Sequence, residues 1–283
     1  AVNGDTLGAG DQGIMYGYAC SETENLLPLP VVLAHRLTAL LTCARTMGRI
    51  SGLRPDGKAQ VSVEYAFGAP RRISAIVLSC QHAEDKDLPR LREELLEFVI
   101  QPALRIFPAD EDTEILINPS GRFVQGGIEA DTGLTGRKLM VDTYGGLVPH
   151  GGGALSGKDG TKMDRSGAYM ARCIAKNIVA AGLAEKCTVA LAYAIGRADP
   201  VAVDVDTHLT GTYPDELLEQ AVRCFFGLTP AGMIRTLQLD QPIFADACNY
   251  GHFTRANLPW EQTGQAGKFA ELCAELECGD DGG

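Results

Sequence analysis

The chain has 283 residues, of which 45% are hydrophobic and 22% are charged, the composition of a folded globular protein and not of a disordered one. Its net charge is −11, with 25 Lys and Arg against 36 Asp and Glu, so its overall field repels nucleic acid and anionic membranes. No apolar run approaches the roughly 20 residues of a membrane span, so we expect neither a membrane nor a nucleic acid as partner.

The first half of the chain is predicted to form a helix, two strands and a second helix, in that order. Apolar residues recur with helical spacing over residues 31–47 and again over 88–104, where acids and bases fill the outer face. Between these helices, residues 60–65 and 72–79 alternate or run apolar, as strands do. A turn is predicted at residues 54–57, Arg-Pro-Asp-Gly, before the first strand.

The second half repeats this order of elements. Asp164 is a candidate N-cap for its first helix, which Gly182 would end. After Gly264 a last helix is expected, followed by an end that frays. The helix, two strands and helix of the repeat are predicted at residues 165–181, 187–196, 201–208 and 214–226.

The repeat predicts two related α+β domains, each with an α-β-β-α order and helices on one face of its sheet. Its period is about 130 residues, longer than the repeats of solenoid proteins. Both strand pairs have connections too short for a parallel crossover, so we expect them to be antiparallel. The join lies near Gly126 and Gly127, which gives a first domain of residues 1–125 and a second of residues 126–283.

The nine cysteines are scattered along the chain and form no Cys-x-x-Cys pair. Most lie within apolar helix or strand patterns, as Cys43, Cys173 and Cys224 do, and are predicted to be core residues. We therefore expect reduced thiols in a cytoplasmic protein, and not zinc ligands or disulfides.

Residues 118–165 differ from the rest of the chain, because they hold 12 of the 33 glycines with positive side chains between them. Glycine lets a backbone approach a ligand closely, and spaced cations neutralise a polyanion. The segment is therefore predicted to bind a polyphosphate, the alternative being a loop-rich connector with ordinary surface charges. Its cations are Arg122, Arg137, Lys138, Lys158, Lys162 and Arg165.

Residues 152–158 match the Gly-x-x-x-x-Gly-Lys pattern of a P-loop, but Asp159 follows where a magnesium-binding Ser or Thr is required. No apolar strand precedes the segment, so a P-loop kinase is excluded, while phosphate binding by Lys158 remains predicted. Asp159 and Asp164 flank Lys162, which favours carboxylates for Mg²⁺ beside cations for phosphate. A helix cap at Asp164 does not exclude a metal there.

Residues 8–13, Gly-Ala-Gly-Asp-Gln-Gly, form a second unusual loop. They predict either a tight turn or, through Asp11, hydrogen bonding to a ribose or an amino acid. His82 and His252 lie in regular patterns without a second ligand at metal spacing, so both are interpreted as structural. No Gly-x-Ser-x-Gly motif is present and no cysteine has an obvious base partner, so covalent catalysis lacks a candidate.

Three segments, in this order, are similar to the signatures of the S-adenosylmethionine synthetase (methionine adenosyltransferase) family. They are residues 8–13, residues 133–146 (Gly-Leu-Thr-Gly-Arg-Lys with Val-Asp-Thr-Tyr-Gly-Gly) and residues 150–166 (His-Gly-Gly-Gly-Ala-Leu-Ser-Gly-Lys-Asp on to Lys-Met-Asp-Arg-Ser). Shorter segments fit too, at residues 54–58, 118–124 and 250–253. The family has Phe where this chain has Leu155, and a Pro near Ile128 is absent, but neither change removes a charged group.

The resemblance implies the S-adenosylmethionine synthetase fold, with two of three similar α+β domains around a pseudo-threefold axis. Residues 1–125 would be the central domain and residues 126–283 the C-terminal one, while the N-terminal domain with its His-Pro-Asp-Lys motif is not in this sequence. Residues 1–7 resemble the end of the loop that gates the family's active site. We therefore expect a larger fragment, divided in that loop, with a separate N-terminal fragment as partner.

The resemblance also implies an activity, S-adenosylmethionine synthesis from ATP and L-methionine. Methionine sulfur attacks C5′ of ATP, and the tripolyphosphate that leaves is hydrolysed, with two Mg²⁺ per site and K⁺ as cofactors. Sulfur is already a good nucleophile, which agrees with many cations and no nucleophilic side chain. Family members are homodimers with shared active sites, or tetramers. An alternative is a non-catalytic ATP-binding regulatory subunit of such an enzyme.

The family's site residues transfer to matching positions, with Phe123 stacking on adenine. The ATP contacts would be Asp56, Lys58, Arg122, Phe123, Asp131, Arg137, Lys138, Ala154 and Lys158. Methionine would contact Asp11, Asp131 and Lys162. Asp164 would bind Mg²⁺, and the carbonyl of Ser156 would lie near K⁺. The residues expected to carry catalysis are Asp131, Arg137, Lys138 and Lys158.

Overall fold

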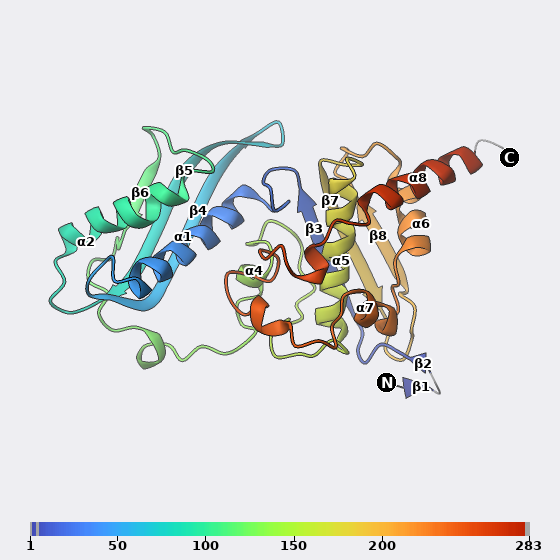
Figure 1. The fold of residues 1–283 in the computed structure, drawn as a ribbon, viewed down its shortest axis with the longest axis horizontal. Helices are drawn as coiled ribbons and strands as arrows, with labels where there is room; N and C mark the ends of the chain where they lie inside the picture. Colours follow the sequence, from blue (N-terminus) through green and yellow to red (C-terminus); the bar gives the residue numbers. More distant parts are fainter. Residues whose placement is uncertain (1, 4–5, 281–283) are drawn as a thin grey trace. The chain divides into compact units, whose positions relative to one another are not determined.

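The computed structural model describes residues 2–3 and 6–280, and the chain divides into two compact units (Figure 1). One unit is Leu29–Leu134, and the other combines the residues before it with the residues after it. Part of the expected gating loop at residues 1–7 lies outside the described residues, as do residues 281–283 of the end that is predicted to fray.

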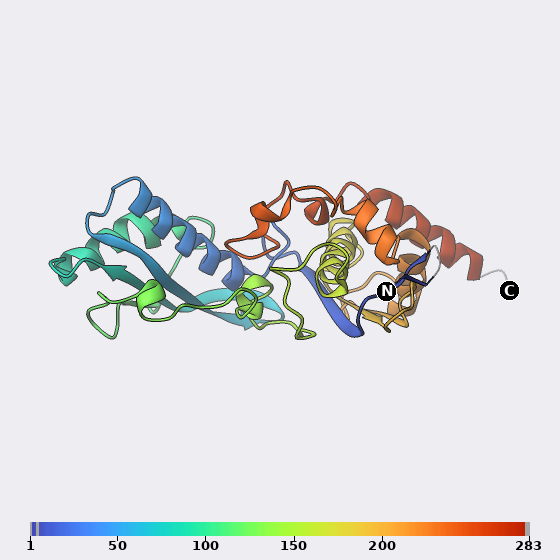
Figure 2. The same ribbon diagram turned by 90° about the horizontal axis from the view of Figure 1, so that it is seen from below.

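The unit Leu29–Leu134 is a three-stranded sheet with helices on one face, as Figure 2 shows. Strands β4 and β5 pair antiparallel, and β6 lies parallel to β5. The elements are α1 (Leu29–Thr46), β4 (Leu53–Ala66), β5 (Ala69–His82), α2 (Leu88–Leu95), a π-helical turn (Leu96–Ile100), α3 (Gln101–Ala103), β6 (Glu114–Ile117) and a 3-10 turn (Gly127–Glu129).

The core of this unit lies between the helices and the sheet. Leucines at helical spacing on α1 pack against apolar side chains of β5 and of the helix that begins at Leu88. Buried members include Leu33, Leu37, Leu41, Ile73, Ile76, Leu78, Leu91, Leu95 and Val99.

Two features of this unit differ from the sequence prediction. The turn predicted at residues 54–57 is wrong, because these residues belong to β4, whose pairing with β5 shifts register between Leu53 and Gly57. Such an irregularity accommodates Pro and Gly without ending the strand. Strand β6 is missed, because its four residues are too few for a clear alternation.

The other unit is built around α5 (Met163–Ala180), which packs on the sheet β3-β7-β8. Figure 2 shows α5, α6 and α8 on one side of this sheet. Its remaining elements are β1 (Val2–Asn3), β2 (Thr6–Leu7), β3 (Gly13–Cys20), α4 (Leu139–Asp142), β7 (Lys186–Tyr193), β8 (Ala202–Asp206), α6 (Asp215–Phe225), α7 (Pro230–Thr236), 3-10 turns (Phe244–Ala247 and Pro259–Glu261) and α8 (Ala266–Asp280).

Strand β3 ties the start of the chain to its second half. It pairs antiparallel with β7 over its whole length, from Gly13 opposite Tyr193 to Cys20 opposite Lys186. The sequence pattern misses β3 because glycines interrupt its apolar alternation. The residues before Leu29 therefore pack with the second half, and the domain division between residues 125 and 126 remains a prediction.

Helix α5 lies very close to β3. A Cβ atom at Gly17 would stand 2.0 Å from the carbonyl carbon of Ala171, so only glycine allows this approach. The helix begins at Met163, so Asp164 is not the predicted N-cap but lies in the first turn. Its end is as predicted, because Gly182 has φ +72° and the N–H groups of residues 182 and 183 cap the last carbonyls.

The α-β-β-α repeat is confirmed, as α1-β4-β5-α2 and as α5-β7-β8-α6, and both predicted strand pairs are antiparallel. All nine cysteines are free thiols. Cys173 is buried as expected, Cys43 is half-buried and Cys224 is exposed, so the prediction of a core position is wrong for Cys224. No helix among the described residues is long and apolar enough to cross a membrane.

Candidate functional site

Two of the glycine-rich segments meet at Asp164, in the first turn of α5. A Cβ atom at Gly153 would stand 2.1 Å from Asp164 Oδ1, and one at Gly13 would stand 3.9 Å from the same oxygen. The partial positive charge of a helix N-terminus stabilises a carboxylate in the first turn. Gly153 therefore leaves room for Asp164, and the helix stabilises its charge.

The third glycine-rich segment joins them through Gly136. A Cβ atom there would stand 2.6 Å from that of Ala154. Gly151 lies against the backbone of β3, where a Cβ atom would stand 1.7 Å from the carbonyl oxygen of Ile14. Residues 8–13, 133–146 and 150–162 thus converge beside the start of α5, although they are far apart in sequence.

Lys158 and Asp164 form an ion pair within this region. Lys158 Nζ lies 2.5 Å from Asp164 Oδ2, and the side chains are 31% and 27% exposed. A pair with this exposure contributes at most about 1 kcal/mol to folding. Both charges therefore remain accessible to a ligand at little cost to stability.

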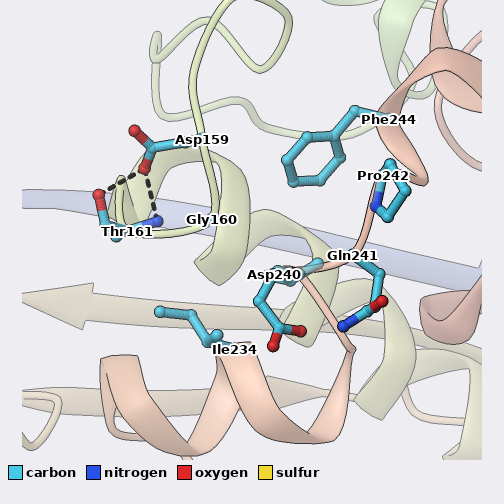
Figure 3. Close-up of a pocket in the computed structure, with 9 residues that line it drawn as sticks. Asp159, Gly160, Thr161, Ile234, Asp240, Gln241, Pro242 and Phe244 are labelled. Atoms are coloured by element: carbon cyan, nitrogen blue, oxygen red, sulfur yellow. Dashed lines mark hydrogen bonds between the residues drawn. The ribbon is translucent and has the colours of Figure 1, made fainter.

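Asp159 and Lys162 lie in the same loop but have local contacts. Asp159 accepts hydrogen bonds from the backbone N–H of Thr161, at 2.8 Å, and from its hydroxyl, as Figure 3 shows. These two bonds hold the pKa of the Asp159 carboxyl below its usual value. The exposed ammonium of Lys162 donates to Thr161 Oγ1 at 3.4 Å. Asp159 is thus engaged with its own loop, while Asp164 contacts Lys158.

Three further predicted residues of this unit, Asp11, Arg137 and Lys138, are exposed, while Ala154 and Ser156 are half-buried. Arg137 and Lys138 follow Gly136 directly, and in the described part of the chain neither side chain has a hydrogen bond or an ion pair. Asp11 is exposed as well, and its carboxylate accepts from the backbone N–H of Gln12 at 2.9 Å. These three side chains lie on the segments that converge beside the start of α5, and their exposure leaves them accessible to a ligand.

A buried chain of hydrogen bonds lies under the loop, and the sequence does not predict it. The guanidinium of Arg165 donates to the carbonyl of Lys158 at 2.5 Å and to the hydroxyl of Tyr169 at 3.0 Å. Tyr169 Oη lies 2.6 Å from His252 Nδ1, and His252 Nε2 lies 3.0 Å from Ser156 Oγ. The place of Arg165 among the glycines predicts a cation on the surface. In the structure Arg165 is buried instead, with 4% exposure.

Burial, with a smaller contribution from the positive charge of Arg165, lowers the pKa of His252 to about 4. The imidazole is therefore neutral at neutral pH and carries one N–H. The interpretation of His252 as structural, made from the sequence, agrees with its burial and its hydrogen bonds to protein groups.

Next to these hydrogen-bonded side chains lies a cavity of about 430 Å³, whose lining residues are drawn in Figure 3. Its walls are the loop at Asp159–Thr161 and the segment after α7, with the Phe244 ring on one side. The guanidinium carbon of Arg165 lies 3.7 Å from the centre of that ring, a cation–π contact. The cavity is thus a neighbour of the loop that carries Lys158.

The unit Leu29–Leu134 holds the other predicted residues, beginning with Phe123. The backbone N–H of Phe123 donates to His82 Nε2 at 3.0 Å, so that ring orients the segment. The carboxylate of Asp56 accepts from Gly127 N–H at 2.8 Å. A Cβ atom at Gly126 would meet both Phe123 and Asp56, at 2.8 and 3.1 Å. Phe123 and Asp56 are therefore brought together around Gly126.

Lys58, Arg122 and Asp131 are exposed on the surface of this unit. The guanidinium of Arg122 donates to the carbonyl of Glu84, and Asp131 accepts from Gly133 N–H at 3.1 Å. The sequence prediction missed Gln81, whose amide donates to Val124 O at 3.0 Å and holds the Phe123 segment on β5. A polar residue at the end of an apolar strand is the only sequence signal for it.

Within residues 2–3 and 6–280, no group of three or more His, Cys, Asp or Glu side chains could hold a metal ion by itself. Asp164 is the carboxylate at the convergence of the glycine-rich segments. Mg²⁺ is often bound by one or two carboxylates together with substrate phosphates. A single carboxylate among phosphate-binding cations fits that mode of binding.

Two family models match this chain. The model for the central domain of S-adenosylmethionine synthetase matches residues 6–123, and the model for its C-terminal domain matches residues 125–262. Together they account for most of the chain.

Known relatives agree with these matches. The S-adenosylmethionine synthase of a Nitratiruptor species is 53% identical over 271 residues, which are 95% of this chain and 70% of that protein. The S-adenosylmethionine synthase of Thermus thermophilus is 54% identical over 260 residues, 92% of this chain and 66% of that one. The chain thus spans about two thirds of the length of these relatives. Both domain models and both relatives therefore assign the chain to the S-adenosylmethionine synthetase family, a family of methionine adenosyltransferase enzymes.

Proposed function

We propose that this chain takes part in the synthesis of S-adenosylmethionine from ATP and L-methionine. The observation that carries the proposal is the convergence of three glycine-rich segments on the Lys158–Asp164 pair, in a chain 53% and 54% identical to S-adenosylmethionine synthases. Methionine sulfur attacks C5′ of ATP, the C5′–O bond breaks, and a sulfonium product and free tripolyphosphate result. The tripolyphosphate is then hydrolysed to phosphate and pyrophosphate.

This reaction needs no nucleophilic or basic side chain from the protein. The thioether sulfur is nucleophilic without a base, so the site must align it with C5′ and stabilise a leaving group of about four negative charges. A loop with accessible cations and glycines supports that task. Lys158, Arg137 and Lys138 stabilise the charge on the tripolyphosphate, and Ala154 contacts ATP with its backbone. Lys162 and Asp11 contact methionine.

The residues of the unit Leu29–Leu134 bind the nucleoside part of ATP. Phe123 stacks on adenine, and Asp56, beside it, accepts hydrogen bonds. Lys58 and Arg122 add positive charge for the phosphates. Asp131 contacts both substrates. The nearness of both Phe123 and Asp56 to Gly126 supports a common role for these two residues.

Mg²⁺ and K⁺ are the proposed cofactors, with two Mg²⁺ per site. Asp164 holds Mg²⁺ together with the phosphates, and the carbonyl of Ser156 lies at the K⁺ site. When bound, these cations neutralise part of the charge that develops on the leaving tripolyphosphate.

The proposed assembly is a homodimer with shared active sites, or a tetramer. A cytoplasmic location is proposed as well, because nine free thiols are typical of a reducing compartment. Sedimentation of the purified chain measures its oligomeric state, and disruption of the assembly is expected to remove activity.

The decisive experiment is product formation. The chain is incubated with ATP, L-methionine, Mg²⁺ and K⁺, alone and with a polypeptide that supplies the part of the Nitratiruptor relative that it does not span. S-adenosylmethionine is measured by mass spectrometry, and phosphate and pyrophosphate are measured in parallel. We expect product in the supplemented mixture. ATP binding without product in either mixture would contradict the catalytic proposal and favour a non-catalytic ATP-binding regulatory subunit.

A further inference from the structure

We propose that Arg165, Tyr169 and His252 are positioning residues, which hold the loop of Ser156 and Lys158 in the conformation that binds tripolyphosphate. The proposal rests on the proposed function of that loop, and it concerns buried groups that touch no substrate. It assigns a specific role to side chains that the sequence interpretation treated more generally, Arg165 as one cation of a polyphosphate-binding segment and His252 as structural.

The geometry is a closed ring of contacts. Arg165 donates hydrogen bonds to the carbonyl oxygen of Lys158 and to the hydroxyl of Tyr169. Tyr169 is in turn hydrogen-bonded to His252. His252 then returns to Ser156, only two residues before Lys158. Both ends of the tripeptide Ser156–Lys158 are therefore fastened to one buried group of side chains, on either side of a glycine.

The hydrogen atoms in this ring can be assigned. Tyr169 Oη accepts from Arg165 Nε, and its own buried hydrogen needs an acceptor, which His252 Nδ1 supplies. The neutral imidazole then carries its hydrogen on Nε2 and donates it to Ser156 Oγ. Each hydrogen bond of the ring thus has one donor and one acceptor, so a change at one member leaves its neighbour with an unmade bond.

The ring is also rigid. Arg165 and Tyr169 lie four residues apart on the same face of α5, and Tyr169 stacks on Trp260 with ring centres 3.8 Å apart. The backbone N–H of His252 donates to Asp142 O, and its carbonyl accepts from Trp260 Nε1–H, both at 2.8 Å. Tyr169 and Trp260 are 0% exposed and His252 is 2% exposed. The loop is thus fastened to side chains that are packed in the interior and shielded from solvent.

Arg165 has a second property that fits an anion-binding loop. In the described part of the chain it forms no ion pair, and its contacts are a carbonyl, a phenol and the Phe244 ring. A buried cation without a counter-charge is costly, and a polyanion bound above it lowers that cost. Position and charge therefore both favour tripolyphosphate at this loop, and they can be separated by substitution.

The test compares two buried tyrosines in this chain. In Tyr169→Phe the hydroxyl that joins Arg165 to His252 is removed. In the control Tyr193→Phe a hydroxyl of similar burial, which donates to Leu228 O at 2.6 Å, is removed away from the loop. Affinity for inorganic tripolyphosphate is measured by calorimetry, and exchange of the loop amides of residues 150–160 is measured by mass spectrometry.

We expect Tyr169→Phe to bind tripolyphosphate about tenfold more weakly, the effect of losing one or two net hydrogen bonds, and to exchange the loop amides faster. Tyr193→Phe should change neither, although both variants lose some stability. Equal behaviour of the two variants in the exchange measurement would overturn the proposal. If the unchanged chain does not bind tripolyphosphate, the proposed function fails, and the exchange comparison still decides whether the ring positions the loop.

A second pair of variants separates position from charge. Arg165→Lys keeps the positive charge but cannot bond Lys158 O and Tyr169 together in the fixed geometry of a guanidinium, while Arg165→Met removes both. We expect both variants to exchange the loop amides faster, and Arg165→Met to bind tripolyphosphate more weakly than Arg165→Lys. Full affinity and slow exchange in Arg165→Lys would show that the charge alone matters and would overturn the positioning role.

Discussion

Helices α1 and α5 have the same length, 18 residues, and each precedes an antiparallel pair of strands, yet their side chains have opposite tasks. On α1 the leucines on one face are buried and the other face is partly or fully exposed. On α5 almost every residue from Met163 to Val179 is buried, including Arg165, Arg172 and Lys176. One helix covers its sheet, and the other is the centre of its unit.

The buried charges of α5 show what the central position requires. Arg172, with 0% exposure, donates to both carboxylate oxygens of Glu261 at 2.9 Å and to the carbonyls of Tyr18, Asn25 and Leu26. Lys176 lies 2.7 Å from the same carboxylate.

Each of the three charges is paired and hydrogen-bonded, which is what makes a buried ion cluster tolerable in a folded protein. A repeated helix can therefore keep its length and its place in the order of elements while only one copy carries buried charges and residues of the candidate site.

The largest effect is expected at the start of α5. Lys158→Ala should lower turnover about a thousandfold or more in an assay of S-adenosylmethionine formation, because a cation that stabilises the leaving group is removed. Methionine affinity should change little. Lys268→Ala, an exposed lysine on α8, is the control. Near-normal turnover of Lys158→Ala would remove this residue from the mechanism.

A comparison of two arginines tests the buried cluster. Arg172→Leu on α5 should lower the free energy of unfolding by about 3–5 kcal/mol, because Glu261 is left buried with only Lys176 as partner. Among the residues that the structure describes, the side chain of Arg36 on α1 donates only to Pro102 O, at 3.3 and 3.4 Å. Arg36→Leu should cost less than about 1 kcal/mol. Urea unfolding of the two variants measures both values, and equal losses would contradict the contrast between the helices.

The pH dependence of stability tests the environment of α1. Burial lowers the pKa of His35 from its ordinary value of 6.5 to about 4. Between these values the unfolded chain binds a proton that the folded chain does not, so stability falls as the pH falls from 6.5 to 4, by up to about 3 kcal/mol. His35→Asn should flatten the curve of unfolding free energy against pH over this range. An unchanged slope would mean that the pKa of His35 is the same in the folded and the unfolded chain.

The smallest effects should be alike in the two units. The side chain of Asp87 accepts from Arg90 N–H at 3.0 Å at the start of α2, and that of Thr229 accepts from Gly232 N–H at 3.1 Å at the start of α7. Asp87→Ala and Thr229→Ala should each lower the free energy of unfolding by about 1 kcal/mol. Thermal unfolding is sensitive enough to measure the change, and a loss several times larger at one cap would indicate a further role there.

The regular elements were the predictable part of this molecule. Helical spacing located α1, α5 and α6 within a few residues, and alternation located β7 and β8, because those patterns are local. Strand β3 was missed since its glycines, which the close contact with α5 requires, remove the apolar signal. The turn predicted at residues 54–57 shows that Pro and Gly can also lie inside a bulged strand.

The candidate site could be predicted only in part. Motifs indicated which glycines and cations belong together, and the convergence of their segments agrees with that grouping. The support beneath them could not be read from the sequence, because Tyr169 and His252 lie 83 residues apart and each looks like an ordinary core residue. Arg165 carried a misleading signal, since its charge among glycines is typical of a surface contact.

The pairing of β3 with β7 has a consequence for the order in which the chain folds. During synthesis β3 emerges early, but its only neighbour in the described sheet is made about 170 residues later, and such distant pairings form slowly. Leu29–Leu134 lies between them as a compact unit that can close first on the ribosome. Until β7 is made, β3 has unpaired backbone groups, and an unpaired strand is exposed to aggregation during synthesis.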